Sequence, residues 1–107
     1  MVPHLTTIAE FLAASTEHGA VVIDAYADWC GPCKQMAPLF EMLATKHTNV
    51  AFYKVNTDAA QDLASHLCVT SLPTFLIVRG GHVVDTIIGA NRDRLQTAVA
   101  ALAANVT

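Results

Sequence analysis

This chain carries little charge, and positive charge is the scarcer kind. Only 6 of its 107 residues are Lys or Arg, against 9 Asp or Glu, and charged side chains make up 14% of the sequence. Soluble domains usually contain about 25% charged residues, so an unusually large share of this chain is available for a buried core. The basic residues are scattered and form no stripe that would neutralise phosphates, which argues against nucleic acid as a primary partner.

Long hydrophobic runs are also missing, although 53% of the residues are hydrophobic. Asp24, Asp28 and Gln96 interrupt the longest apolar stretches, so we expect no membrane span. The first basic residue is Lys34. A secretory signal needs a basic start and a transit peptide is rich in Arg, so we expect neither. These features predict a cytoplasmic protein.

Cysteine is scarce too, with 3 residues in the chain. This odd and low number is unlike a small secreted scaffold held together by disulfides. The five His residues are dispersed and show no metal-ligand spacing, so we expect no metal. The length predicts a single domain over residues 1–107.

Segments with strand and helix patterns alternate along the chain. The predicted strands are Val2–Leu5, Ala20–Tyr26, Val50–Val55, Thr74–Arg79 and His82–Ile88. A Gly-Gly pair joins the last two strands, which indicates a tight antiparallel hairpin. The order βαβαβαββα predicts an α/β fold with a central mixed five-stranded sheet and helices on both faces.

Capping residues mark where three of the helices begin. Thr7 and Glu10 form a Thr-x-x-Glu capping box at the start of the first helix. Asp58 is placed to cap a short helix that runs to Leu67, and Asn91 is placed to cap the last helix.

The segment Trp29-Cys30-Gly31-Pro32-Cys33 lies between an apolar strand and a helical pattern. Two thiols at this spacing can close a small disulfide ring and open it again, which transfers two electrons without a bound cofactor. In a chain with βαβ patterning, the spacing is typical of a thiol–disulfide redox site. Pro32 suits the first turn of a helix, and Gly31 lets another backbone approach closely.

The position of the two thiols predicts different roles for them. Cys30 falls at a helix N-terminus, where unpaired backbone N–H groups and the helix dipole stabilise a thiolate. Cys33 lies one turn further in, and we expect it to be more buried. Cys30 is therefore the predicted nucleophile toward a substrate disulfide, and Cys33 the thiol that attacks Cys30 to release the product.

Two other interpretations of the cysteines compete with the redox site. A zinc site needs two more ligands, and Cys68 with His66 offers only a poorly spaced pair. A purely structural bridge over so short a loop would restrict little of the unfolded chain. Both are weaker than the redox interpretation. Cys68 itself is interpreted as a half-buried small hydrophobe, with a regulatory or dimerising thiol as the alternative.

Asp24 interrupts an otherwise apolar strand shortly before Cys30. A carboxylate buried there is costly unless it is protonated or paired. We interpret Asp24 as an acid/base with a raised pKa that takes the proton from Cys33. A contact with solvent at the strand end is the alternative. Lys54, in the next strand, is either its electrostatic partner or a solvated edge residue.

Four segments together resemble the thioredoxin family over essentially the whole chain. They are residues 21–34, which include the Trp-Cys-Gly-Pro-Cys motif, and Lys54–Asp58, Leu72–Phe75 and Ile88–Asn91. The resemblance implies a monomeric protein-disulfide reductase with no bound cofactor. It also implies that NADPH recharges the protein through a thioredoxin reductase, and that its clients are disulfide-containing proteins such as peroxiredoxins or ribonucleotide reductase.

The resemblance further implies how a client is bound. Pro73 would be cis and lie against the disulfide, and the backbone of Leu72 would bind an extended client strand. The remaining substrate-binding residues would be Trp29, Gly31, Pro32, Ile88, Gly89 and Ala90. Three alternatives stay open: a protein dedicated to one oxidoreductase client, a protein working as an oxidant, and a scaffold that uses the same groove without redox chemistry.

Overall fold

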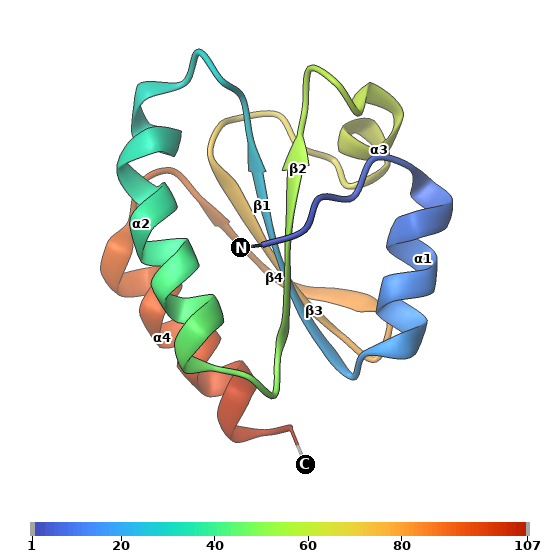
Figure 1. Ribbon diagram of the computed structural model, residues 1–107, viewed down its shortest axis with the longest axis vertical. Helices are drawn as coiled ribbons and strands as arrows, with labels where there is room; N and C mark the ends of the chain where they lie inside the picture. The colour runs from blue at the N-terminus through green and yellow to red at the C-terminus, as the bar shows by residue number, and fades with distance from the viewer. Residues whose placement is uncertain (1, 107) are drawn as a thin grey trace.

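A computed structural model describes residues 2–106, which form four helices and one four-stranded sheet (Figure 1). Along the chain the elements are α1 (Ile8–Glu17), β1 (Ala20–Tyr26), α2 (Gly31–Lys46), β2 (Ala51–Asn56), α3 (Gln61–His66), β3 (Thr74–Arg79), β4 (His82–Ile88) and α4 (Arg92–Ala104). The strand order is β2-β1-β3-β4, with β2 parallel to β1 and the other pairs antiparallel. The predicted α/β fold with a mixed sheet is confirmed.

The prediction of a fifth strand at Val2–Leu5 is wrong. Only His4 pairs with the sheet, in an isolated parallel bridge to Lys54. The Lys54 N–H donates to the Pro3 carbonyl and the Leu5 N–H donates to the Lys54 carbonyl, both over 2.9 Å. Proline has no N–H to extend the ladder backward, and the chain turns into the start of α1 directly after Leu5. The pairing therefore stops after one residue.

Two of the predicted helix starts are confirmed. The Glu10 N–H donates to the Thr7 hydroxyl and the Thr7 N–H donates to the Glu10 carboxylate, each over 3.1 Å. At the start of α4, the Arg94 N–H donates to the Asn91 side chain over 3.1 Å. These bonds satisfy backbone donors that a helix leaves unpaired in its first turn.

The predicted cap on the third helix is wrong. Helix α3 begins at Gln61, its N-cap is Ala60, and no side chain caps it. The Asp58 carboxylate accepts a hydrogen bond from the Trp29 indole instead. The long-range hydrogen bond to Trp29 therefore uses the Asp58 carboxylate that the local sequence pattern assigned to the N-cap of α3.

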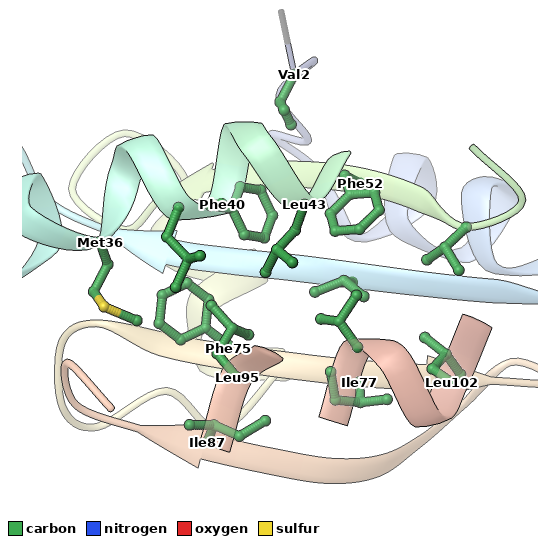
Figure 2. Packing of buried hydrophobic residues seen from close by; sticks show 14 of the residues in the cluster. Val2, Met36, Phe40, Leu43, Phe52, Phe75, Ile77, Ile87, Leu95 and Leu102 are labelled. Carbon is green, nitrogen blue, oxygen red and sulfur yellow. The ribbon is translucent and has the colours of Figure 1, made fainter. Parts of the chain in front are cut away.

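Each face of the sheet carries its own hydrophobic cluster. Helices α2 and α4 cover one face, and α1 and α3 cover the other (Figure 1). Phe40 lies between Phe52 and Phe75, at ring-centroid distances of 5.4 and 5.9 Å (Figure 2). Strand β1 lies between the two layers, which explains why its residues are almost all apolar and why Asp24 is an exception. Within residues 2–106, no helix has both the length and the apolar composition of a bilayer span.

Candidate active site

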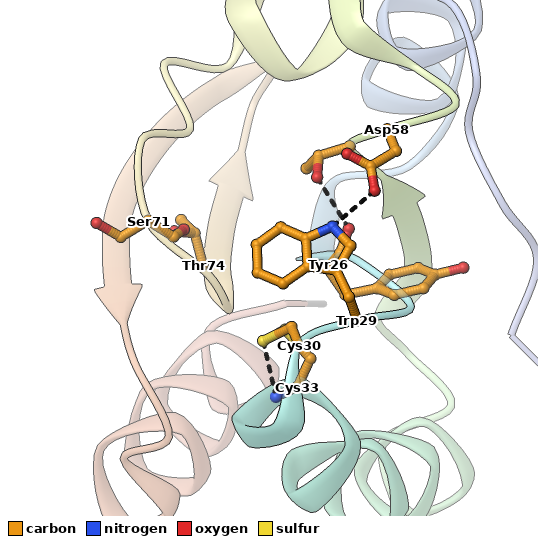
Figure 3. Close-up of a disulfide and its surroundings, with 8 residues drawn as sticks. Tyr26, Trp29, Cys30, Cys33, Asp58, Ser71 and Thr74 are labelled. Atoms are coloured by element: carbon orange, nitrogen blue, oxygen red, sulfur yellow. Dashed lines mark hydrogen bonds between the residues drawn. A yellow bond between two sulfur atoms is a disulfide. The ribbon is translucent and has the colours of Figure 1, made fainter.

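The two cysteines of the motif lie where the chain leaves β1 and enters α2 (Figure 3). Cys30 is the N-cap of α2 and is joined to Cys33 by a disulfide, as the redox interpretation requires. The Cys33 N–H donates to Cys30 Sγ over 3.2 Å. The Cys30 sulfur therefore sits in the positive field of the helix N-terminus with a backbone donor directed at it.

Burial does not separate the two cysteines. Each is 4% exposed, so the expectation that Cys33 is the more buried is wrong. The two residues are equally buried and are joined by the disulfide. What differs is the space that each residue borders. Cys30 borders an outer groove of about 520 Å³, whereas Cys33 borders a smaller inner cavity of about 120 Å³.

The outer groove brings together three parts of the chain that are distant in sequence. Its lining consists of Trp29, Cys30, Gly31, Pro32, Thr57, Val69, Thr70, Ser71 and Leu72. Four of these, Trp29, Gly31, Pro32 and Leu72, are predicted substrate-binding residues. The Trp29 side chain is 71% exposed, and its Nε1–H donates to the Asp58 carboxylate over 2.8 Å (Figure 3). This wall of the groove is therefore both open to solvent and fixed in place.

The other predicted binding residues do not line this groove. Pro73 is buried, and its bond to Leu72 is cis, as the resemblance implied. The Gly89 N–H donates to the Pro73 carbonyl over 2.8 Å. Ile88 pairs with Thr74 at the adjoining end of the β3–β4 ladder and is 60% exposed, and Ala90, also exposed, follows Gly89.

Several groove residues were missed from the sequence. Val69, Thr70 and Ser71 carry no motif, and Thr57 lies within the Lys54–Asp58 segment of the resemblance without an assigned role. Their only signal is position, because three of them directly precede Leu72 and the fourth follows the end of β2.

Asp24 lies within β1. It is 1% exposed, which argues against a solvent contact at the strand end, and its Oδ1 atom has no hydrogen-bond partner within the protein. Burial raises the pKa of Asp24 to about 7, the nearby Lys54 ammonium lowers it, and the Glu41 carboxylate raises it. Asp24 also borders the inner cavity together with Cys33 and Lys54. A carboxyl with this pKa and position can exchange a proton near neutral pH.

Lys54 is the partner of Asp24 in the β1–β2 register. Its side chain is half-buried, and its Nζ lies 4.9 Å from the centroid of the Tyr26 ring. Lys54 is therefore a half-buried residue of the edge strand β2, and its ammonium lies over an aromatic face beside the inner cavity.

Cys68 lies apart from the dithiol and is exposed, so its interpretation as a half-buried hydrophobe is wrong. The chain leaves α3 through a left-handed residue here, with a φ of 60° at Cys68, and this turn carries the side chain away from the buried face of the helix. Over residues 2–106, no group of three or more His, Cys, Asp or Glu side chains is placed to hold a metal ion.

The family model described as Thioredoxin matches residues 2–101. The chain belongs to the thioredoxin family. It is 36% identical to Thioredoxin 1 of Plasmodium falciparum over 104 residues, which cover 97% of this chain and 100% of the relative. It is 38% identical to Thioredoxin-2 of Saccharomyces cerevisiae over 101 residues, 94% of this chain and 97% of the relative.

Solved structures agree with this assignment. Oxidised mitochondrial thioredoxin 3 from Saccharomyces cerevisiae superposes with a TM-score of 0.91 at 37% identity, covering 94% of this chain and 95% of the other. A structure concerning thiol resolution in yeast mitochondrial 1-Cys peroxiredoxin, via glutathione/thioredoxin systems, gives the same TM-score at 36% identity and the same coverage. This thioredoxin-family protein is a thiol–disulfide oxidoreductase of the protein-disulfide reductase type, and Cys30 and Cys33 are its redox pair.

Proposed function

We propose that Cys30 is the nucleophile and Cys33 the resolving thiol in the reduction of client disulfides. The placement of the two residues carries this proposal. Cys30 borders the outer groove and receives the backbone N–H of Cys33, whereas Cys33 borders the inner cavity that contains Asp24. A client therefore meets Cys30 first, and Cys33 meets the buried acid/base.

The proposed reaction has two exchange steps. In the first, the Cys30 thiolate attacks one sulfur of the client disulfide, which forms a mixed disulfide and releases one client thiolate. In the second, the Cys33 thiol gives its proton to Asp24 and attacks Cys30, which releases the second client thiolate and closes the Cys30–Cys33 disulfide. The client gains two electrons, the protein loses two, and the released thiolates take up protons.

Asp24 fits the proton-accepting role because its pKa of about 7 lets it be ionised or neutral near physiological pH. Lys54, which faces it across the β1–β2 pair, stabilises the ionised form. Without that positive charge the buried carboxyl would hold its proton more tightly and accept one from Cys33 less readily.

We propose that an extended client strand lies in the outer groove beside Cys30. Leu72 would offer its backbone to the client, and Trp29, Gly31 and Pro32 would contact it from the other side. The proposed surface continues over Pro73, over Ile88 at the end of β4, and over Gly89 and Ala90, which follow that strand. The exposed Trp29 in the groove wall and the exposed Ile88 on β4 supply apolar contact area for a protein ligand.

The recharging system and the compartment are also proposals. A thioredoxin reductase supplied by NADPH would return the disulfide to the dithiol, with no cofactor bound to this chain and the protein acting as a monomer. Peroxiredoxins and ribonucleotide reductase are proposed clients, and the peroxiredoxin class is supported by the solved structure that concerns its thiol resolution. The proposed compartment is the cytoplasm, because a dithiol reductant needs reducing surroundings.

A trapping experiment tests the order of attack. In a Cys68→Ser background, which leaves only the dithiol, Cys33→Ser should accumulate mixed disulfides with oxidised insulin through Cys30. Cys30→Ser should accumulate few. Mass spectrometry of the trapped peptides identifies the bonded cysteine, and predominant capture through Cys33 would reverse the two roles. NADPH consumption with insulin and a thioredoxin reductase tests the complete cycle.

A further inference from the structure

The N-terminal segment is fixed against the sheet at one point, next to Lys54. Val2 and Leu5 are 5% and 4% exposed and pack into the hydrophobic clusters on opposite faces of the sheet. Between them, the backbones of Pro3 and Leu5 exchange hydrogen bonds with Lys54 on either side of the His4–Lys54 bridge. His4 therefore has a defined position, although its side chain is exposed.

This bridge places four polar side chains on one face of the sheet. His4 is paired with Lys54, and Lys54 is paired with Asp24, so the three residues follow one another across neighbouring chain segments. Tyr26 lies two residues beyond Asp24 and points to the same face, because side chains alternate along a strand. This face lies under α2, where Cys33 and Asp24 border the inner cavity.

Three of these side chains, those of His4, Tyr26 and Lys54, contact one another. The His4 Nε2 atom and the Tyr26 hydroxyl oxygen are 2.7 Å apart, and the rings meet edge to face at a centroid distance of 5.8 Å. The Tyr26 O–H donates to Nε2 when that nitrogen carries no proton, and Nε2–H donates to the hydroxyl oxygen when it does. The Lys54 ammonium lies over the same Tyr26 ring, 4.9 Å from its centroid.

We propose that His4 and Tyr26 are a positioning pair that holds the Lys54 ammonium toward Asp24. A lysine side chain is long and flexible, and it loses much rotational freedom when its ammonium is held in one place. The ring of Tyr26 gives the ammonium an attractive surface, and the bond to His4 fixes the orientation of that ring. The inference rests on the proposed role of Asp24 as the acid/base of the resolving step.

The charges around Asp24 set the direction of the effect. Lys54 on β2 favours the ionised carboxylate, whereas burial and Glu41 on α2 oppose it. Asp28 and Lys34 border the same cavity from the loop and from α2. If the Lys54 ammonium moves away from this position, it stabilises the carboxylate less, and the pKa of Asp24 rises further.

The test uses Tyr26→Phe, which keeps the ring and removes the hydroxyl, and His4→Ala, which removes the other partner. The apparent pKa of Asp24 is followed by carboxyl NMR and by the pH profile of mixed-disulfide resolution. Each variant should raise this pKa by roughly 0.5, because a less firmly held Lys54 ammonium attracts the carboxylate more weakly without being lost. Because Asp24 titrates near pH 7, resolution at that pH should be about twofold slower. His82→Ala, an exposed histidine on β4, should leave both measurements unchanged.

Three further measurements separate positioning from a loss of folding. His4→Gln can still hydrogen-bond to Tyr26 and should recover most of the wild-type pKa. The double variant His4→Ala/Tyr26→Phe should show no larger effect than either single variant, since both break one bond. Unfolding in urea reports the stability of each variant. If His4→Ala destabilises the fold, the pKa of Asp24 in Tyr26→Phe tests the positioning pair, because this variant keeps the ring and its packing.

The outcome also separates this inference from the proposed function. If Asp24→Asn resolves mixed disulfides at the wild-type rate, the acid/base role fails. If Asp24→Asn is slow while Tyr26→Phe and His4→Ala keep the wild-type pKa of Asp24, the role stands and the positioning pair is wrong. In the Asp24→Asn background neither variant should change the pH profile, and an effect that persists there also overturns the pair.

Discussion

The Trp29 indole and the Asp58 carboxylate are hydrogen-bonded over 2.8 Å although they are 29 residues apart in the chain. A second link lies beside this one. Thr57 donates to the Tyr26 carbonyl from its backbone N–H over 2.9 Å and from its hydroxyl over 3.1 Å. The loop that carries the redox motif is therefore joined to the loop after β2 at two points. Both loops contribute to the wall of the outer groove, so its shape depends on these bonds.

Asp58→Ala should weaken client binding more than it slows the chemistry. A single hydrogen bond contributes about 0.5–1.5 kcal/mol, so the KM for insulin should rise roughly two- to tenfold with little change in kcat. Trp29 is the only tryptophan in the chain, and its fluorescence anisotropy should fall as the indole becomes mobile. Asp62→Ala removes the same charge from an exposed position one turn away. An equal rise in KM in this control would assign the effect to charge and not to the bond.

Local sequence signals predicted those parts of the fold that depend on neighbouring residues. Strands β1, β3 and β4 have the predicted bounds, because an apolar run or a Gly-Gly turn marks their ends. The errors arise where distant residues decide the outcome. Asp58 is a good helix cap by itself, but Trp29 takes its carboxylate. The Val2–Leu5 segment has strand composition, but only one of its residues reaches a partner.

The candidate site divides in the same way. Cys30, Cys33 and Asp24 stand out from their neighbours in the sequence, since each is an unusual residue for its position. Thr70 and Ser71 of the groove have no such contrast and become visible only once the chain has folded. The contact between His4 and Tyr26 depends on the isolated β-bridge between His4 and Lys54. The alternation of polar and apolar residues in the sequence does not predict a bridge of one residue.

Asp24→Asn should stabilise the protein, and more so at high pH. The pKa of Asp24 is raised from an ordinary value of 3.8 to about 7, so between these pH values the folded state binds more protons than the unfolded state. The free energy of unfolding therefore falls as the pH rises through this range. The cost is absent below pH 4 and complete above pH 7. Urea unfolding should show that the gain from Asp24→Asn is larger at pH 8 than at pH 4 by on the order of 4 kcal/mol.

A matched control for this prediction is Asp62→Asn, which removes a carboxylate from an exposed position. Its effect on the free energy of unfolding should stay below about 1 kcal/mol at both pH values. A gain from Asp24→Asn that does not vary with pH would show that the carboxyl keeps the same pKa in the folded and unfolded chain.

Cys68→Gly should stabilise the fold without affecting turnover. Cys68 has a φ of 60°, a left-handed conformation that costs a residue with a side chain about 1–2 kcal/mol. Glycine removes this strain but adds about 0.5–1 kcal/mol of entropy to the unfolded state, so the net gain should be roughly 0.5–1 kcal/mol. Cys68→Ser keeps the strain and should give no gain. Both variants should reduce insulin at the wild-type rate, and a loss of activity shared by both would give the exposed thiol a part in turnover.

Ile88→Ser tests whether the client surface extends beyond the outer groove. The Ile88 side chain is 60% exposed beside Thr74, and a client strand over Pro73 would cover it. Complete burial of an isoleucine contributes about 1.5–3 kcal/mol, so loss of a partly covered one should raise the KM for insulin roughly fivefold. Reduction of a small aromatic disulfide, which needs only the sulfur atoms, should keep its wild-type rate.

Val84→Ser is the matched control for Ile88→Ser. Val84 belongs to the same strand, is 57% exposed, and lies toward the hairpin end of β4, away from the redox pair. It should leave the KM for insulin unchanged, because a client on Cys30 does not reach it. If the two variants raise the KM equally, Ile88 contributes only general surface hydrophobicity. The client surface would then end at the residues that line the outer groove.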